Sequence, residues 1–192
     1  MRLGRCLPLV LLIVAILNVR AGAAPFVLFP QAGQLLSPDG HFVLRSVENE
    51  SPAGEFVGTF RALWVTELAT GRSRKLCDYM GVAAAAWSGN DFILITQYVA
   101  KKTSRALVFA LSGPQEDVTL DAPTLIRLVP PEMREPLRGN DHVFVEASRL
   151  EAEILHVRVW GYGRHDPGGF RWECQYGLRD GQAACAEEKR SR

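Results

Sequence analysis

The chain has 192 residues, of which 47% are hydrophobic and 22% are charged, and its formal net charge is +1. This composition excludes a mostly disordered chain, and the near-neutral charge gives no electrostatic basis for binding nucleic acid or an anionic membrane surface. The length suits one domain with a substantial hydrophobic core. We therefore expect a folded protein without a nucleic-acid partner.

The first 23 residues have the pattern of a secretory signal peptide. Arg2 and Arg5 form a basic start, residues 7–19 are almost all apolar, and residues 21–23 (Ala-Gly-Ala) are small, as a signal peptidase requires. The apolar run has 13 residues, whereas a spanning helix needs about 20, so an uncleaved anchor is the less favoured alternative. We predict cleavage after Ala23, export to the periplasm or beyond, and no membrane insertion after cleavage. The mature chain would carry 19 basic and 21 acidic residues.

Short apolar segments with turn signals between them follow one another every 8–12 residues, which is typical of an all-β protein. The expected strands are 42–47, 60–68, 73–77, 82–87, 92–99, 105–111, 142–148, 154–162, 169–176 and 183–187. The small-residue run 82–87 is expected to be an inner strand close to its neighbours.

The β pattern breaks at residues 123–138. Residues 124–129 are either a strand or a short helix, Pro130-Pro131 ends that segment, and 131–137 are expected to form a helical turn. We predict one all-β domain over residues 24–186 and a charged, disordered tail over 187–192.

A weak repeat runs through the chain. Residues 36–44 (Leu-Ser-Pro-Asp-Gly-His-Phe-Val-Leu) return as 86–95 and again as 139–145, and each copy is a polar turn that leads into an apolar strand. The copies start about 50 residues apart, which is a spacing typical of β-propeller blades. Three units do not obviously close a ring, because propellers typically have about four to eight blades. An irregular stack, a β-sandwich or small barrel, and closure by oligomerisation remain as alternatives.

Residues 36–44, together with Leu63–Arg72 and Ala86–Asp91, resemble a blade of the TolB-type, WD40-like propeller repeats of secreted bacterial proteins. In that family a Ser-Pro-Asp-Gly turn starts a strand, and a Leu-Ala-Thr-Gly turn follows a later strand of the blade. The resemblance covers residues 36–95, and only the first copy has an intact Ser-Pro-Asp-Gly. It implies propeller-like blades that bind proteins or peptides, and it carries no catalytic residue over to this chain. The excess of Arg over Lys favours a GC-rich bacterial source.

Three cysteines remain after the predicted cleavage, and an exported protein can form disulfides. Cys174 and Cys185 flank Asp180-Gly181, a hairpin turn signal. If the hairpin loop has two residues, Cys185 lies directly opposite Tyr176. The two cysteines are then diagonal neighbours on the same face of the hairpin. We predict a Cys174–Cys185 disulfide and a buried free thiol at Cys77, and the alternative pairs Cys77 with one of the other two. These cysteines lack the histidine spacing of a zinc site.

The segment Gly161–Gly169 (Gly-Tyr-Gly-Arg-His-Asp-Pro-Gly-Gly) is the best candidate for a ligand site. The predicted ligand-binding residues are Tyr162, Arg164, His165 and Asp166. Neighbouring His and Asp side chains can serve as a base with an orienting partner or as metal ligands. No Gly-x-Ser-x-Gly nucleophile motif and no phosphate-loop Lys-Ser/Thr accompanies them. A plain hairpin connection is the structural alternative.

The remaining histidines and the tryptophans are expected to have structural roles. His41 and His142 occupy similar turn-to-strand junctions, and His156 lies on the polar side of an alternating strand. The tryptophans are expected in the core and not on a sugar-stacking platform; they are Trp64, Trp87, Trp160 and Trp172.

These features predict a non-catalytic module that binds another envelope or secreted protein, with no cofactor, metal or catalytic residue. The first alternative is a hydrolase or a carbohydrate-active, ligand-binding domain that uses residues 161–169. A further alternative is an accessory subunit that completes a partner's β-sheet. The sequence leaves open whether the chain forms a homo-oligomer.

Overall fold

The computed structural model describes residues 25–49, 60–99, 102–113, 116–164 and 166–188. The predicted signal peptide and most of the predicted tail lie outside these ranges. The elements are β1 (Val27–Phe29), β2 (Gln34–Leu36), β3 (Phe42–Asn49), β4 (Phe60–Glu67), β5 (Ser73–Met80), β6 (Ala83–Ser88), β7 (Phe92–Val99), β8 (Thr103–Ala110), β9 (Val118–Leu120), α1 (Ala122–Leu128), α2 (Pro131–Gly139), β10 (His142–Glu151), β11 (Ile154–Tyr162), β12 (Phe170–Gly177) and β13 (Ala183–Glu187).

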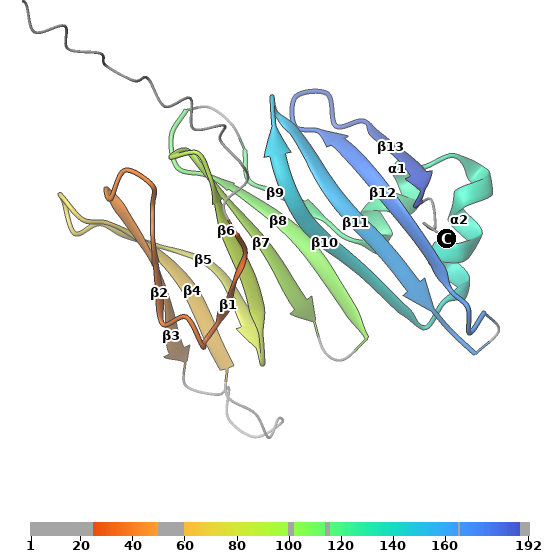
Figure 1. Ribbon diagram of the computed structural model, residues 1–192, viewed down its shortest axis with the longest axis horizontal. Coiled ribbons are helices and arrows are strands. Elements are labelled where there is room, and N and C mark those ends of the chain that lie inside the picture. Colours follow the sequence, from red (N-terminus) through yellow and green to blue (C-terminus); the bar gives the residue numbers. More distant parts are fainter. Residues whose placement is uncertain (1–24, 50–59, 100–101, 114–115, 165, 189–192) are drawn as a thin grey trace, which may run out of the picture.

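The strands form two sheets (Figure 1). A four-stranded sheet has the order β2-β3-β4-β5, and a nine-stranded sheet has the order β1-β6-β7-β8-β10-β11-β12-β13, with β9 paired to β8. All pairs are antiparallel except β8 with β10. The prediction of an all-β fold is therefore confirmed, and of the predicted alternatives the structure fits an irregular β-sandwich of open sheets.

Two hydrophobic cores lie on opposite faces of the long sheet. The first core fills the space between the four-stranded sheet and strands β1, β6, β7 and β8, with Phe29, Leu63 and Ile95 among its buried residues. The second core lies under α1, α2 and β9 and extends along β10, β11 and β12, with Leu125 and Val157 among its buried residues. Strands β7 and β8 belong to both cores, which explains why they are apolar on both faces.

A buried polar side chain also connects the two sheets. Gln97 on β7 is 6% exposed, and its amide nitrogen donates to the backbone carbonyl of Asp78 on β5. The side chain of Arg105 on β8 donates to the amide oxygen of Gln97. Both ends of the buried amide are thus satisfied, as its burial requires.

Strand β10 joins the rest of the long sheet through side-chain hydroxyls more than through a backbone ladder. Its parallel pairing with β8 begins at Val143 and Thr103. Beyond that point Ser104 Oγ donates to the carbonyl of Val145 (3.0 Å) and accepts from its N–H (2.9 Å). Backbone groups of β10 are therefore hydrogen-bonded to a side chain of the neighbouring strand β8.

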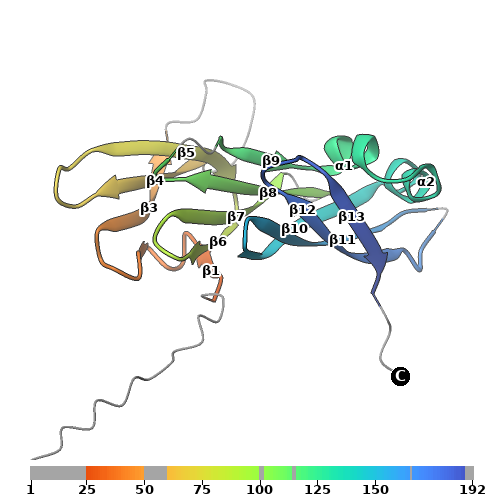
Figure 2. The ribbon, with the colours of Figure 1, turned by 90° about the horizontal axis from the view of Figure 1, so that it is seen from above.

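The same type of contact continues on the next two strands. The N–H of Ala147 donates to Thr96 Oγ1 on β7 (3.0 Å), and Ser88 Oγ on β6 donates to the carbonyl of Leu150 (3.1 Å). The three hydroxyls come from three adjacent strands, so β10 crosses this face diagonally. The crossing separates the β10–β13 strands from the β6–β8 strands, as the view from above shows (Figure 2).

The helices explain why the β pattern breaks. Asp121 caps the first turn of α1 by accepting from the N–H of Thr124 (2.9 Å), and Pro123 occupies the first turn, where a missing N–H is tolerated. The helical alternative for 124–129 is the one found, and the predicted turn at 131–137 is helix α2. Among the described residues, no helix is both long and apolar enough to cross a membrane.

The repeated turns do not occupy equivalent places in all three units. Residues 37–41 join β2 to β3 and residues 89–91 join β6 to β7, so the first two copies connect the first and second strands of a four-stranded meander. Residues 140–141 instead join α2 to β10. The second and third units also share one sheet through the β8–β10 pair.

The Cys174–Cys185 disulfide is present, but its predicted register was wrong. The two cysteines are direct cross-strand partners, and Tyr176 faces Ala183. The reason is a four-residue loop, closed where the N–H of Gly177 donates to the carbonyl of Gln182 (3.0 Å). Gly181 adopts a φ of +66°, which favours glycine at that position.

Strand β13 extends further than the predicted domain end at residue 186. Glu187 is its last residue, and the N–H of Glu188 donates to the carbonyl of Arg171 (3.0 Å). The start of the predicted tail is therefore bonded to β12, and residues 189–192 lie outside the described residues.

We expect Thr96→Val to lower the free energy of unfolding by about 1–3 kcal/mol, because the N–H of Ala147 would be buried without an acceptor. Ser104→Ala should cost at least as much, since both backbone groups of Val145 lose a partner. Urea denaturation measures both values. Thr119→Val is the control, because Thr119 is an exposed strand residue, and its effect should stay within about 0.5 kcal/mol. Equal effects of Thr96→Val and Thr119→Val would contradict the role of the hydroxyls.

The cysteines give a second prediction. Among the cysteines that the structure describes, Cys77 is the free thiol, and burial raises its pKa to about 12. We expect iodoacetamide to modify Cys77 about 100-fold more slowly in the folded than in the unfolded protein, because the thiolate is the reactive form. Peptide mapping by mass spectrometry measures this rate. Alkylation of Cys174 or Cys185 in the unfolded, unreduced protein would contradict the disulfide.

Candidate binding face

The candidate site is the face of strands β10–β13 that lies opposite the helices. Burial alternates along β11, where Leu155, Val157 and Val159 are fully buried in the second core and the residues between them point outward. The outward residues of neighbouring strands form rows in the strand register. We call this surface the open face, and its residues are His142, Phe144, Glu146, His156, Arg158, Trp160, Tyr162, Arg171, Glu173, Gln175, Ala184 and Ala186.

One half of the open face is aromatic. His142 and Tyr162 are cross-strand partners and their rings stack, with centroids 4.5 Å apart and planes 4° apart. Phe144 and Trp160 form the next such pair, at 4.1 Å and 18°. Along β11 itself, the rings of Trp160 and Tyr162 are 6.1 Å apart and only 14° from parallel. The four rings therefore form two parallel rows, one on β10 and one on β11.

A glycine allows the aromatic strands to approach each other. A Cβ on Gly161 would lie 2.6 Å from the carbonyl oxygen of His142 and 2.7 Å from the ring of Phe170. Both distances are below van der Waals contact, so only glycine fits between these neighbours. Gly161 thus allows β11 to pack closely against the backbone of His142 on β10 and the ring of Phe170 on β12.

The prediction that all four tryptophans lie in the core was wrong for Trp64 and Trp160, which belong to neither core. Trp87 and Trp172 are each 3% exposed and belong to the first and second core. Trp64 is half-buried on β4, and Trp160 is half-buried on the open face. Strand alternation places Trp160 outward, and hydrophobicity alone does not reveal that this face of β11 has no covering layer.

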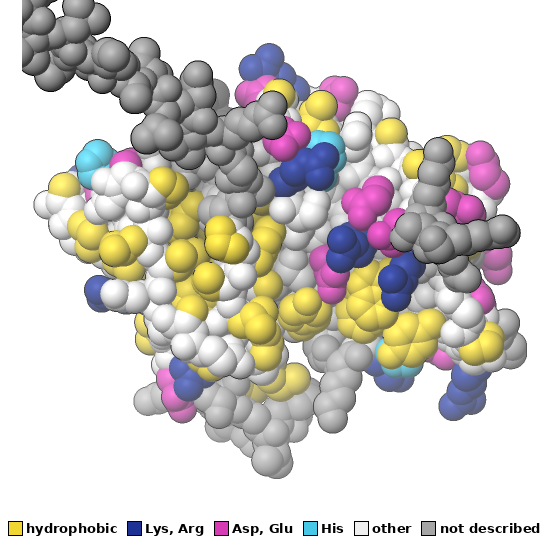
Figure 3. Space-filling model, viewed as in Figure 1, with side chains coloured by type: hydrophobic (Ala, Val, Ile, Leu, Met, Phe, Trp, Pro, Cys, Tyr) yellow, Lys and Arg dark blue, Asp and Glu magenta, His cyan; other side chains and the backbone are white. Residues whose placement is uncertain are grey.

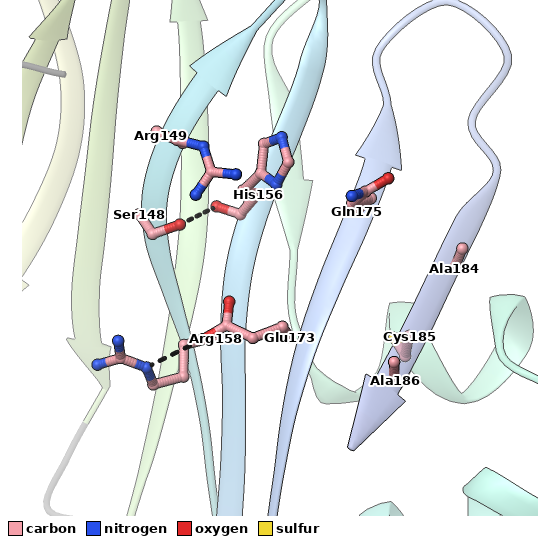
Figure 4. Close-up of a pocket in the computed structure, with 9 residues that line it drawn as sticks. All are labelled: Ser148, Arg149, His156, Arg158, Glu173, Gln175, Ala184, Cys185 and Ala186. Carbon is pink, nitrogen blue, oxygen red and sulfur yellow. Dashed lines mark hydrogen bonds and ion pairs between the residues drawn. The ribbon is translucent and has the colours of Figure 1, made fainter. Parts of the chain in front are cut away.

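The other half of the open face is polar and forms an open pocket of about 540 Å³ (Figure 4). Arg158 and Glu173 are cross-strand partners that form an ion pair at 3.5 Å. Arg149 forms an ion pair with Glu151 at 3.2 Å. Figure 3 shows hydrophobic side chains over the start of β10 and the end of β11, with charged side chains of both signs above them. The cations and anions beside the rings therefore compensate each other.

His156 lies in the polar half, as its expected place on a polar strand face implies. Partial burial, and then the neighbouring Arg149, hold its pKa below the usual value of 6.5. The imidazole is therefore neutral at neutral pH.

The pocket does not form a nucleophile–base pair from the described residues. Ser148 and His156 both line it, but the hydroxyl of Ser148 donates to the backbone carbonyl of His156 (3.0 Å) and not to its imidazole. Among the described residues, no cluster of three metal-ligating side chains occurs. The arrangement can bind a ligand by stacking and hydrogen bonds.

The structure describes three of the four predicted ligand-binding residues, and these three have different surroundings. Tyr162 belongs to the aromatic rows and is 42% exposed. Asp166 holds the β11–β12 connection, because its carboxylate and its carbonyl both accept from the N–H of Gly169 and its carbonyl also accepts from Gly163. Arg164 is exposed, and His165 lies outside the described residues. The missed residues are Phe144, Arg158 and Trp160, which the alternation of β10 and β11 could have revealed.

The other histidines differ from each other in their surroundings. His41 is exposed beside Asp39, whose carboxylate accepts from its backbone N–H (3.0 Å) and from the side chain of Ser37. These two hydrogen bonds, led by that from Ser37, lower the pKa of Asp39. His142 instead stacks on Tyr162, so the two histidines have no common structural role.

A second pocket, of about 290 Å³, lies between β5 and β7 at the far side of the first core. Its lining is mainly apolar and includes Tyr79, Met80, Tyr98 and Val99. Burial raises the pKa of Tyr98 to about 12, helped by Glu146, which accepts from its hydroxyl at 3.2 Å. This hydrogen bond orients Glu146 at the border of the open face.

No protein-family model matches the chain, and no curated protein or solved structure matches it either.

We expect His156 to titrate below pH 6.5, and Arg149→Gln to raise its pKa toward that value because a nearby positive charge is removed. NMR titration of the imidazole measures both. Since the unfolded chain binds the proton more readily, the contribution of His156 to stability is present above about pH 6.5 and is lost as the pH falls through the folded pKa. Arg45→Gln on β3 is the control and should leave the titration unchanged. An unchanged pKa in Arg149→Gln would contradict the assignment.

Proposed function

We propose that the protein is an exported bacterial, non-catalytic module that binds another protein or an envelope component through its open face. The observation that supports the proposal most is the double row of aromatic rings beside a charge-balanced polar pocket. Aromatic side chains that are partly exposed and held in place by stacking are typical of binding surfaces. The signal-peptide pattern at residues 1–23 supports export.

The alternative function, a hydrolase that uses residues 161–169, has less support. In that segment the Asp166 carboxylate is engaged with the backbone N–H of Gly169 (3.0 Å), which gives it a role in holding the turn. The resemblance to TolB-type, WD40-like repeats also favours binding, because it carries no catalytic residue over to this chain. The periplasmic or extracellular location belongs to the same proposal.

The test is affinity capture of the tagged protein from its own host after mild crosslinking. We expect a reproducible partner for the natural chain, and capture reduced at least about 10-fold by Trp160→Ala and Tyr162→Ala, because aromatic anchors dominate binding energies. Leu36→Ala with Leu68→Ala is the matched control, since these exposed apolar residues lie on the four-stranded sheet and its β4–β5 loop. Thermal unfolding verifies that each variant folds.

Two outcomes would count against this proposal. Capture that survives both aromatic substitutions would remove the open face from the interaction. Substrate turnover that is lost in His165→Ala and Asp166→Ala, with partner capture unchanged, would favour the hydrolase.

A further inference from the structure

We infer that the open face binds a neutral polysaccharide, which stacks on Trp160 and Tyr162 and hydrogen-bonds to the side chains of the polar half. This inference rests on the proposed binding function and names its ligand class.

The two rings of β11 form a stacking surface. Trp160 and Tyr162 are successive outward residues on one strand, and their planes differ by 14°. Phe144 and His142 stack on them from the side of β10 at 4.1 and 4.5 Å. One side of each β11 ring is therefore supported by β10, and the opposite side faces β12. A supported ring loses little conformational entropy when a ligand stacks on it.

The space beyond the rings is bordered by small and polar side chains. Ala184 and Ala186 are the outward residues of β13, and they leave room above that strand. Between them and β11 lie Glu173 and Gln175 on β12, which line the pocket of about 540 Å³. Carboxylate, amide and guanidinium groups together supply both acceptors and donors. A sugar ring requires this combination, because it has an apolar C–H face and hydroxyls that both donate and accept.

The charges of this face favour a neutral ligand. Arg158 is paired with Glu173 and Arg149 with Glu151, at 3.5 and 3.2 Å. Arg171, which lies opposite Trp160 and has no ion-pair partner among the described residues, is offset in number by Glu146. The open face as a whole therefore has no excess of cations, which a polyanion would need. A protein partner in an interface of standard size would bury a total area of about 800 Å² on each side, and it would have to desolvate the central ion pairs. Among the outward residues of β11, Tyr162 (42%) and Ile154 (37%) are the large hydrophobic residues with more than a third of their surface exposed, and they lie at opposite ends of the strand.

The test is affinity gel electrophoresis of the full protein in gels that contain soluble neutral polysaccharides (β-glucan, xylan, galactomannan, glycol chitin), with cosedimentation on purified peptidoglycan sacculi. We expect retardation by at least one of these polymers. Trp160→Ala and Tyr162→Ala should each weaken it at least about 10-fold, and Trp160→Phe should retain most of it because a ring remains. Glu173→Gln, a substitution at an exposed position, should also weaken it. Leu36→Ala with Leu68→Ala is the control.

The outcomes separate this inference from the proposed function. Binding only to the sacculi, whose peptide stems carry carboxylates, and weakened by salt, would overturn the inference. No binding to any polysaccharide, with capture of a protein partner that is lost in Tyr162→Ala, would overturn it and leave the proposed function in place. No binding of either kind would overturn both.

Discussion

The structure depends on the burial of the β7–β8 hairpin on both of its faces. Ile93 and Ile95 of β7 pack in the core under the four-stranded sheet, whereas Leu94 between them packs in the core under the helices. The same alternation on β8 places Leu107 and Val108 in different cores. A central hairpin of this kind has no polar face, and every other layer of the molecule is positioned by contact with one side of it.

The crossing of β10 follows from that central layer and creates the candidate site. Ser88, Thr96 and Ser104 lie on three adjacent strands, and their hydroxyls meet the backbone of β10 along a diagonal. The β10–β13 strands therefore leave the plane of β6–β8, and α1 and α2 cover only their inner face. The outer face carries the aromatic rows and the ion pairs, so the candidate binding surface is a consequence of how two parts of one sheet meet.

Much of the local structure could be predicted. Strands 92–99, 154–162 and 183–187 have the expected bounds, because each has a clear apolar pattern and a turn before it. Strands β1, β2 and β9 were missed, since three residues are too few for a periodic pattern. For β1 the partner strand, β6, is also distant in sequence. The sequence also contained a signal for the disulfide register, because Leu68–Gly71 and Leu178–Gly181 share the pattern Leu-x-x-Gly. Both segments form four-residue hairpin loops with the same hydrogen bond, in which the glycine N–H donates to the carbonyl four residues earlier.

The sequence by itself determined the all-β class, most strands, the Cys174–Cys185 pair and the outward direction of alternate residues on β11. These features depend on local backbone preferences and on turns that join neighbouring segments. Only the tertiary structure decided that Trp160 stands on an open face, that Phe144 supports it, and that the second and third units share a sheet. Those features depend on which face a distant segment covers, and contacts between segments far apart in the chain leave no periodic pattern in either of them.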